Sequence, residues 1–288
     1  MVRVLRNLNI SMQVGAILGS LIAVETKNVS FSNQFYIQGL SVVANAVLVY
    51  FALLGHVDAK EEIREPKSGD KKEATGLFEG LRLIATDRYV MAITVVSTFT
   101  EVIFTIMDFQ MKVLANEQFE TKEEFKAFMG TFGIASNTVS LIFAILGTKF
   151  LLERLGLLTC LVSIPSLILG LISAVYVYPS VWMAFSGIVA VKALGYSLNK
   201  PCIEVTYTHT STDTRFKAKS WIEMFGTRGA KAGGSMVNNA FRHNIDALMT
   251  QGSMVSFGFT VVWLYCAQRL GAMYEKTIPT TPTVVKHE

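Results

Sequence analysis

Charged side chains inside apolar segments are the residues of this sequence that could do chemistry. Asp108 and Lys112 lie within one such segment, and Lys192 and Glu204 lie within another. On insertion scales, a charge at the centre of a bilayer costs about 2.5–3.5 kcal/mol. A membrane protein that keeps such charges commonly uses them for a polar solute or an ion. A transporter is therefore the first hypothesis for this chain.

In the segment 89–115, Glu101, Asp108 and Lys112 recur at intervals of seven and four residues, so a helix would carry all three on one face. Asp108 and Lys112 can form an i,i+4 ion pair, which lowers the cost of burying either charge. This spacing predicts a carboxylate that either takes up a proton or holds a lysine until a substrate anion displaces the carboxylate. A structural ion pair near the helix end explains Asp108 and Lys112 equally well.

The second charged segment combines Lys192 and Glu204 with Gly195, Lys200 and Pro201. Proline removes a backbone donor, so a broken or kinked helix is expected here. Unwound backbone beside a lysine and a glutamate can line a polar cavity. A kink at the membrane interface, with the charges among the headgroups, is the simpler explanation for Lys200.

A third segment is rich in small residues and carries two cations. Gly226, Ala230 and Gly234 repeat every four residues, which predicts a face for close contact with another helix. Arg228 and Lys231 lie about 60° apart around the same helix. Arginine binds phosphate as a fork and lysine as a point charge, so phosphate is the natural partner of both.

These three segments define the predicted site. The predicted ligands of substrate phosphates are Lys192, Arg228, Lys231 and Lys112. The predicted ion-pairing and gating carboxylates are Asp108, Glu204 and Glu101.

The elements that position these residues are predicted to be membrane spans. The chain is 51% hydrophobic and only 17% charged, whereas a soluble protein of 288 residues is about a quarter charged. A span needs about 20 mostly apolar residues. The eight segments that meet this criterion are 8–24, 33–55, 89–115, 128–152, 156–178, 181–207, 217–241 and 252–271. The sequence thus predicts an all-α membrane protein with eight transmembrane helices.

Lys and Arg concentrate on one side of these spans, which predicts that both termini are cytoplasmic. The charged segment 56–88 is expected to be a cytoplasmic linker that ends in a short amphipathic helix at the membrane surface. The predicted domains are a pair of spans over 1–55, this linker, a six-helix bundle over 89–272 and a cytoplasmic tail over 273–288.

Other chemistry has no recognisable pattern in this sequence. There is no GxxxxGK[ST] loop for nucleotide hydrolysis, and the four histidines and three cysteines are scattered without ligand spacing. We therefore expect no enzyme activity, no metal, no cofactor and no nucleic-acid partner.

From Asp108 onward, the sequence resembles the ATP/ADP translocases of plastids and obligate intracellular parasites. Asp108 and Lys112 match a Glu–Lys pair of that family. Further matches are Lys192, Tyr196-Ser197-Leu198, Pro201, Glu204, Tyr207, Lys217, Lys219, Lys231 and Gly233-Gly234. The departures are Asp108 for Glu, Gly195 and Ile203 for lysines, Glu223 for Asp and Ala232 for Ser. The loss of two lysines bears on which substrate is preferred.

The resemblance implies a major-facilitator-like fold with twelve helices, of which the eight predicted spans match helices five to twelve and the first four are absent. It also implies a carrier that exchanges ATP for ADP across a parasite plasma membrane or an organelle envelope. Two alternatives stay open: a proton-coupled symporter of nucleotides or another anion, and a truncated relative that does not transport. Whether the chain works alone, as an oligomer or with a missing N-terminal half is equally open.

Overall fold

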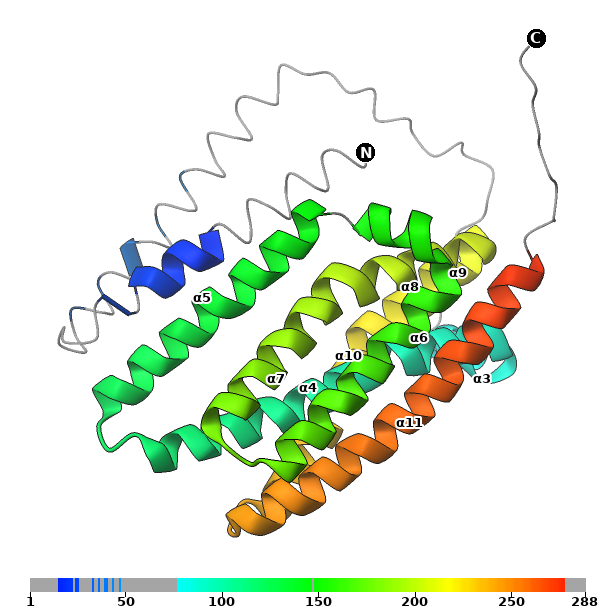
Figure 1. Ribbon diagram of the computed structural model, residues 1–288. Helices are drawn as coiled ribbons and strands as arrows, with labels where there is room; N and C mark the ends of the chain where they lie inside the picture. Colours follow the sequence, from blue (N-terminus) through cyan, green and yellow to red (C-terminus); the bar gives the residue numbers. More distant parts are fainter. Residues whose placement is uncertain are drawn as a thin grey trace.

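The computed structural model describes residues 77–146 and 148–277, together with scattered positions between residues 15 and 47. Residues 15–22 of the first predicted span are helical. Residues 8–14, most of span 33–55, most of the linker and the end of the tail lie outside the described residues, so what is expected of them stays a prediction. Every regular element between residues 77 and 277 is a helix (Figure 1). The elements are α3 (Leu77–Thr86), α4 (Arg88–Gln118), α5 (Lys122–Leu146), α6 (Thr148–Val177), α7 (Val181–Leu194), η1 (Gly195–Asn199), α8 (Lys200–Thr206), η2 (Tyr207–His209), α9 (Thr212–Trp221), η3 (Ile222–Gly226), α10 (Thr227–Phe241) and α11 (Ile245–Thr277).

Each predicted segment after residue 88 is helical, although several boundaries differ. Helix α5 ends at Leu146, before the predicted end at residue 152. Within α6, Gly156 has a φ of 78°, a left-handed conformation that favours glycine and separates a short first part from a long apolar one. Among the described helices, three are long and apolar enough to cross a membrane: α4, α6 from Arg154 and α11. The total of eight spans remains a prediction.

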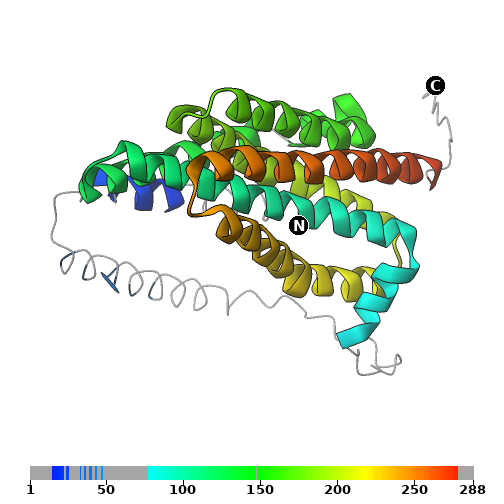
Figure 2. The same cartoon turned by 90° about the horizontal axis from the view of Figure 1, so that it is seen from below.

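Helix α4 lies at the centre of the bundle. It packs against α11, α10 and α7, while α6 packs against α11 and α5 against α7. Seen from below, α4 and α11 lie between α6 on one side and α10 on the other (Figure 2). Apolar side chains of α4, such as Ile93 and Ile103, are fully buried, as are Ile188 of α7 and Trp263 of α11. This core fixes the position of α4 relative to the helices that carry the cationic residues.

The contact between α10 and α4 depends on small residues. A Cβ added to Gly234 would lie 2.9 Å from Thr105 Cβ and 3.0 Å from the carbonyl oxygen of Val102. Asn238 Nδ2 also donates a 3.0 Å hydrogen bond to the carbonyl oxygen of Thr105. The predicted close-contact face of this segment is confirmed, and it brings Lys231 of α10 near Glu101 of α4.

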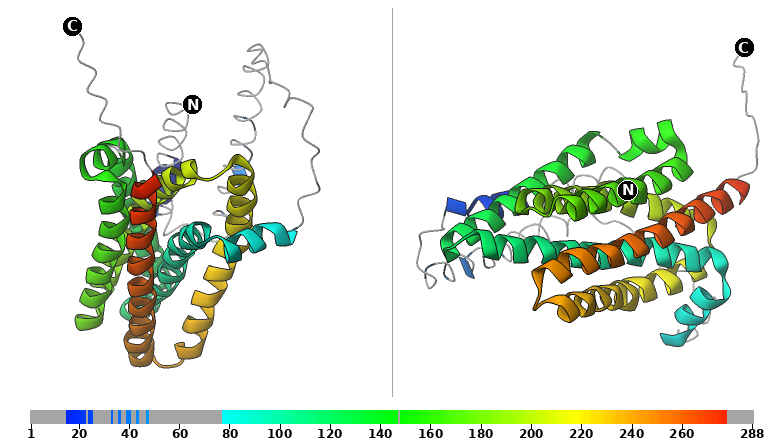
Figure 3. Two further views of the ribbon diagram at one scale, coloured as in Figure 1. Left: turned by 90° about the vertical axis from the view of Figure 1, so that its right-hand side faces the viewer. Right: turned by 60° about the horizontal axis from the view of Figure 1, so that its bottom comes forward.

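The short helix α3 lies at one end of the bundle, at an angle to the long helices (Figure 3). It packs against α9, where Lys217 Nζ lies 2.7 Å from Glu79 Oε1 and 2.8 Å from Asp213 Oδ2. A Cβ added to Gly80 would lie 2.8 Å from the carbonyl oxygen of Lys217. The predicted helix at the end of the linker is confirmed, and it supports the start of the segment that carries Lys219 and Lys231.

Candidate functional site

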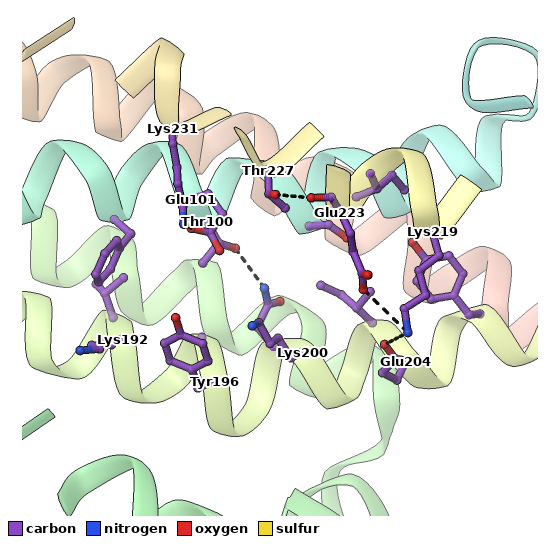
Figure 4. Close-up of a pocket in the computed structure, with 18 residues that line it drawn as sticks. Thr100, Glu101, Lys192, Tyr196, Lys200, Glu204, Lys219, Glu223, Thr227 and Lys231 are labelled. Carbon is purple, nitrogen blue, oxygen red and sulfur yellow. Dashed lines mark hydrogen bonds and ion pairs between the residues drawn. The ribbon is translucent and has the colours of Figure 1, made fainter. Parts of the chain in front are cut away.

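A cavity of about 360 Å³ lies between three stretches of helix: α4, the α7–η1–α8 stretch and the α9–η3–α10 stretch (Figure 4). The ionisable groups that line it are mainly lysines and glutamates. They are Lys192, Lys200, Lys219, Lys231, Glu101, Glu204 and Glu223. Four lysines against three glutamates leave the cavity with one unbalanced positive charge.

One wall of the cavity is a row of side chains spaced by four residues. The row consists of Lys192, Tyr196, Lys200 and Glu204, which follow one another along one stretch of helix in Figure 4. In an ideal α-helix each step of four residues drifts by about 40° around the axis. Segment η1 is a π-helix, in which the backbone N–H of Lys200 donates to the carbonyl oxygen of Gly195. The wider turn counteracts the drift, so the row stays on one face.

The facing wall repeats this arrangement. Its row consists of Lys219, Glu223, Thr227 and Lys231, again spaced by four residues. A second π-helix, η3, interrupts the helix in the middle of the row, where the backbone N–H of Thr227 donates to the carbonyl oxygen of Ile222. π-Helical turns are frequent at functional sites. Here two of them line the same cavity.

The α-helix is interrupted before Pro201, as expected, but by the π-helix η1, and the expectation of unwound backbone is wrong. Gly195, Asn199 and Lys200 all have right-handed helical φ and ψ. Pro201 occupies the first turn of α8, directly after the π-helix. Proline has no backbone N–H to donate, but in the first turn of a helix that hydrogen bond is not needed. The chain therefore continues as a helix through Pro201, directly after the change of hydrogen-bond register.

Ion pairs occupy two places in the cavity. On the α4 side, Lys231 Nζ lies 3.4 Å from Glu101 Oε2. Toward α9, Lys219 Nζ lies 2.5 Å from Glu204 Oε1 and 3.9 Å from Glu223 Oε1. Arg215 Nη2 lies 3.6 Å from the other oxygen of Glu204. Thus every carboxylate that lines the cavity already faces a cation.

Lys192 and Lys200 differ from the other two lysines, because neither forms an ion pair with any residue that the structure describes. Instead, Lys192 Nζ lies 5.2 Å from the ring centroid of Phe132. Lys200 Nζ lies 4.4 Å from the ring centroid of Tyr196. An aromatic face is a weak partner for an ammonium group compared with an anion. These two lysines are therefore available to a negatively charged ligand.

The remaining predicted site residues lie outside the cavity lining. Lys112 Nζ lies 2.5 Å from Asp108 Oδ2, so the predicted i,i+4 pair is present, and both residues are close enough to Lys192 to interact with it electrostatically. Arg228 is exposed on α10. The cavity therefore brings together Lys192, Lys231, Glu101 and Glu204 but not Lys112, Asp108 or Arg228. The roles of all seven residues stay predictions.

Sequence reasoning did not assign site roles to Lys200, Lys219, Glu223 and Tyr196, which also line the cavity. The signal that could have found them is a repeat of four residues: Tyr196 and Lys200 continue it between Lys192 and Glu204, and Glu223 and Lys219 lie eight and twelve residues before Lys231. That signal alone cannot reveal the π-helices, which keep the rows aligned.

Long apolar helices packed around a charged cavity define an integral membrane protein of the transporter class. Residues 7–233 match the Major Facilitator Superfamily, and the chain belongs to this superfamily.

Several relatives carry the same kind of name. The chain is 23% identical over 300 residues to ADP,ATP carrier protein 1 of Rickettsia bellii, covering 94% of this chain and 60% of the relative. It is 21% identical to ADP,ATP carrier protein 4 of Rickettsia felis, covering 88% and 56%. It is 22% identical to ADP,ATP carrier protein 1 of Chlamydia muridarum, covering 73% and 44%. The resemblance to ATP/ADP translocases is confirmed, and the chain spans about half the length of these relatives.

Proposed function

We propose that this protein carries purine nucleotides across a membrane and exchanges ATP for ADP. The observation that carries the proposal is a pair of lysines, Lys192 and Lys200, that form no ion pair with a described residue and line a cavity that also contains Lys231. The names of the relatives support nucleotides as the substrates.

Lys192, Lys200 and Lys231 would bind the phosphate chain. Each ammonium group is a compact point charge with three donors, a common ligand of phosphate oxygens. Coulomb attraction grows as the local dielectric constant falls, so a cavity among apolar helices strengthens the attraction to a polyphosphate. The more highly charged ATP gains more from this attraction than ADP does.

Glu101 and Glu204 would pair with lysines in the absence of substrate. The Lys231–Glu101 and Lys219–Glu204 contacts are of this kind. A bound polyphosphate exchanges these internal ion pairs for contacts with its own oxygens. Without substrate, the unbalanced cations oppose the reorientation of the empty carrier, which favours exchange over net flux.

Asp108 would act as a counter-charge for Lys192, with which it interacts electrostatically. Lys112 and Arg228 remain proposed phosphate ligands for a conformation in which they reach the substrate. The proposal further includes eight spans with both termini cytoplasmic, and alternating access between the 89–272 bundle and a second bundle.

The test is uptake of labelled ATP by cells that express the chain, followed by a chase with unlabelled ADP. Efflux triggered by ADP supports exchange. Uptake that collapses when the proton gradient is removed, and that ADP does not release, would instead indicate a proton-coupled symporter. Membrane-inserted protein that neither binds nor moves ATP would contradict the proposal and favour a non-transporting relative. Arg269→Gln on α11, outside the cavity lining, is a control that should transport normally.

A further inference from the structure

Tyr196 presents an aromatic ring to the cavity. Three aromatic residues line it: Phe104, Tyr196 and Tyr207. Tyr207 is buried, with 2% of its surface exposed, and Phe104 packs against the apolar core. Tyr196 is 48% exposed. Among the described residues that line the cavity, Tyr196 is therefore the aromatic ring most accessible to a ligand.

The position of Tyr196 in its row relates the ring to Lys192 and Lys200, the two lysines that form no ion pair with a described residue. Lys192 precedes it by four residues and Lys200 follows it by four, so each lies about 6 Å along the helix axis from Tyr196. Figure 4 shows the ring between the two lysines. A ligand that binds either lysine through its phosphates can therefore place another part of the same molecule on the Tyr196 ring.

The Lys200 ammonium group, 4.4 Å from the ring centroid, covers one face of Tyr196. A phosphate oxygen is a stronger partner for an ammonium group than an aromatic face is. Phosphate binding would therefore draw Lys200 away from the ring and uncover its face. A planar nucleobase can then stack on this face, whereas an inorganic phosphate leaves it bare.

We infer that Tyr196 is a stacking platform for the nucleobase and that Lys200 moves from the ring to the phosphates when a nucleotide binds. The inference rests on the proposed function, and it adds the basis for preferring a nucleotide to a polyphosphate without a base. Stacking on an aromatic side chain tolerates every base, so the ring selects for a base without reading its hydrogen-bonding edge.

The test compares the affinities for ATP and for inorganic tripolyphosphate of the full-length chain in lipid nanodiscs. Tripolyphosphate carries at least as much negative charge as ATP, so charge alone cannot favour ATP. We expect the wild type to bind ATP about tenfold more tightly than tripolyphosphate. Tyr196→Leu should weaken ATP binding by about this factor, leaving tripolyphosphate binding unchanged. Tyr196→Phe, which keeps the ring, should behave as the wild type.

Tyr265 offers a matched control. It is exposed on α11, outside the cavity lining, and Arg269 lies four residues further on with its guanidinium 5.2 Å from the ring centroid. Tyr265→Leu should keep both affinities.

Three outcomes would overturn the inference. If the wild type binds ATP and tripolyphosphate equally, or if Tyr196→Leu keeps the wild-type ratio, the stacking platform is refuted and the proposed function stands. The wild-type comparison decides this even if Tyr196→Leu does not fold. If the wild type binds neither ligand, the proposed function fails and the inference fails with it.

Discussion

The ammonium group of Lys231 on α10 lies 3.4 Å from the carboxylate of Glu101 on α4, across the close contact between these helices. The Lys231 side chain is 57% exposed, and an exposed ion pair contributes little to stability. The pair can therefore be exchanged for a contact with a ligand at small cost.

Glu101→Gln should tighten ATP binding several-fold, because it removes the carboxylate that competes with phosphate for Lys231. Lys231→Gln should weaken ATP binding by about tenfold, since a charge-assisted hydrogen bond to phosphate is lost. Titration calorimetry on the purified protein measures both affinities. Glu117→Gln, at the exposed end of the same helix α4, is the control and should leave the affinity unchanged. If neither Glu101→Gln nor Lys231→Gln changes the affinity for ATP, the Lys231–Glu101 pair is not part of the nucleotide-binding site.

The Lys219–Glu204 pair joins the two walls of the cavity and predicts a charge-swap rescue. Glu204→Lys and Lys219→Glu each place two like charges in contact, so each should lower the exchange rate by more than about tenfold. The double variant restores the attraction between positions 204 and 219 but leaves like charges beside Arg215 and Glu223, so it should recover part of the rate. The measurement is ATP/ADP exchange in proteoliposomes, with the amount of inserted protein as the control. Effects that simply add in the double variant would show that the two residues act independently.

The π-helix η1 is predicted to set the register of the row that contains Lys200 and Glu204. Inserting one alanine after Ser197 adds a residue beyond the one that the wide turn already absorbs, so the residues that follow should rotate by about 100°. Helix content measured by circular dichroism should stay unchanged, whereas ATP binding should be lost. Ser197→Ala keeps the chain length and serves as the control. A folded insertion variant with wild-type affinity would refute the role of this register.

The small face of α10 predicts a contrast between two neighbouring glycines. A Cβ at Gly234 would meet Thr105 Cβ at 2.9 Å, whereas a Cβ at Gly233 would meet nothing within 4 Å. Gly234→Ala should therefore destabilise the protein by about 1–3 kcal/mol through overpacking. Gly233→Ala, the matched control, should be neutral or slightly stabilising, because alanine favours a helix over glycine. Thermal unfolding in detergent measures both, and equal unfolding temperatures would contradict the close contact.

The helices of the bundle could be predicted because long apolar segments have few alternatives in a membrane. The Asp108–Lys112 pair and the close contact at Gly234 follow from spacing within one helix and were predicted for that reason. Arg228 shows that spacing within one helix does not by itself predict which residues line the cavity. It lies about 60° from Lys231 around α10, and this angle separates a residue that lines the cavity from one that does not.

The π-helices and the cavity could not be predicted, because both depend on how several helices pack together. Lys219 and Glu204 are fifteen residues apart and meet only because the folded chain brings their side chains within reach of one another. A turn with i→i+5 hydrogen bonds leaves no distinctive composition in the sequence, and Pro201 pointed to a break instead. Which lysines lack a carboxylate partner can be read only from the packed structure.

The most direct test of the account is the affinity for ATP of the double variant Lys192→Gln/Lys200→Gln, measured by calorimetry on the full-length chain in nanodiscs. Both lysines line the cavity without a carboxylate partner among the described residues, so their removal should weaken ATP binding by about a hundredfold while the unfolding temperature stays near that of the wild type. A double variant that binds ATP as tightly as the wild type would contradict the claim that this cavity binds the phosphates of a nucleotide.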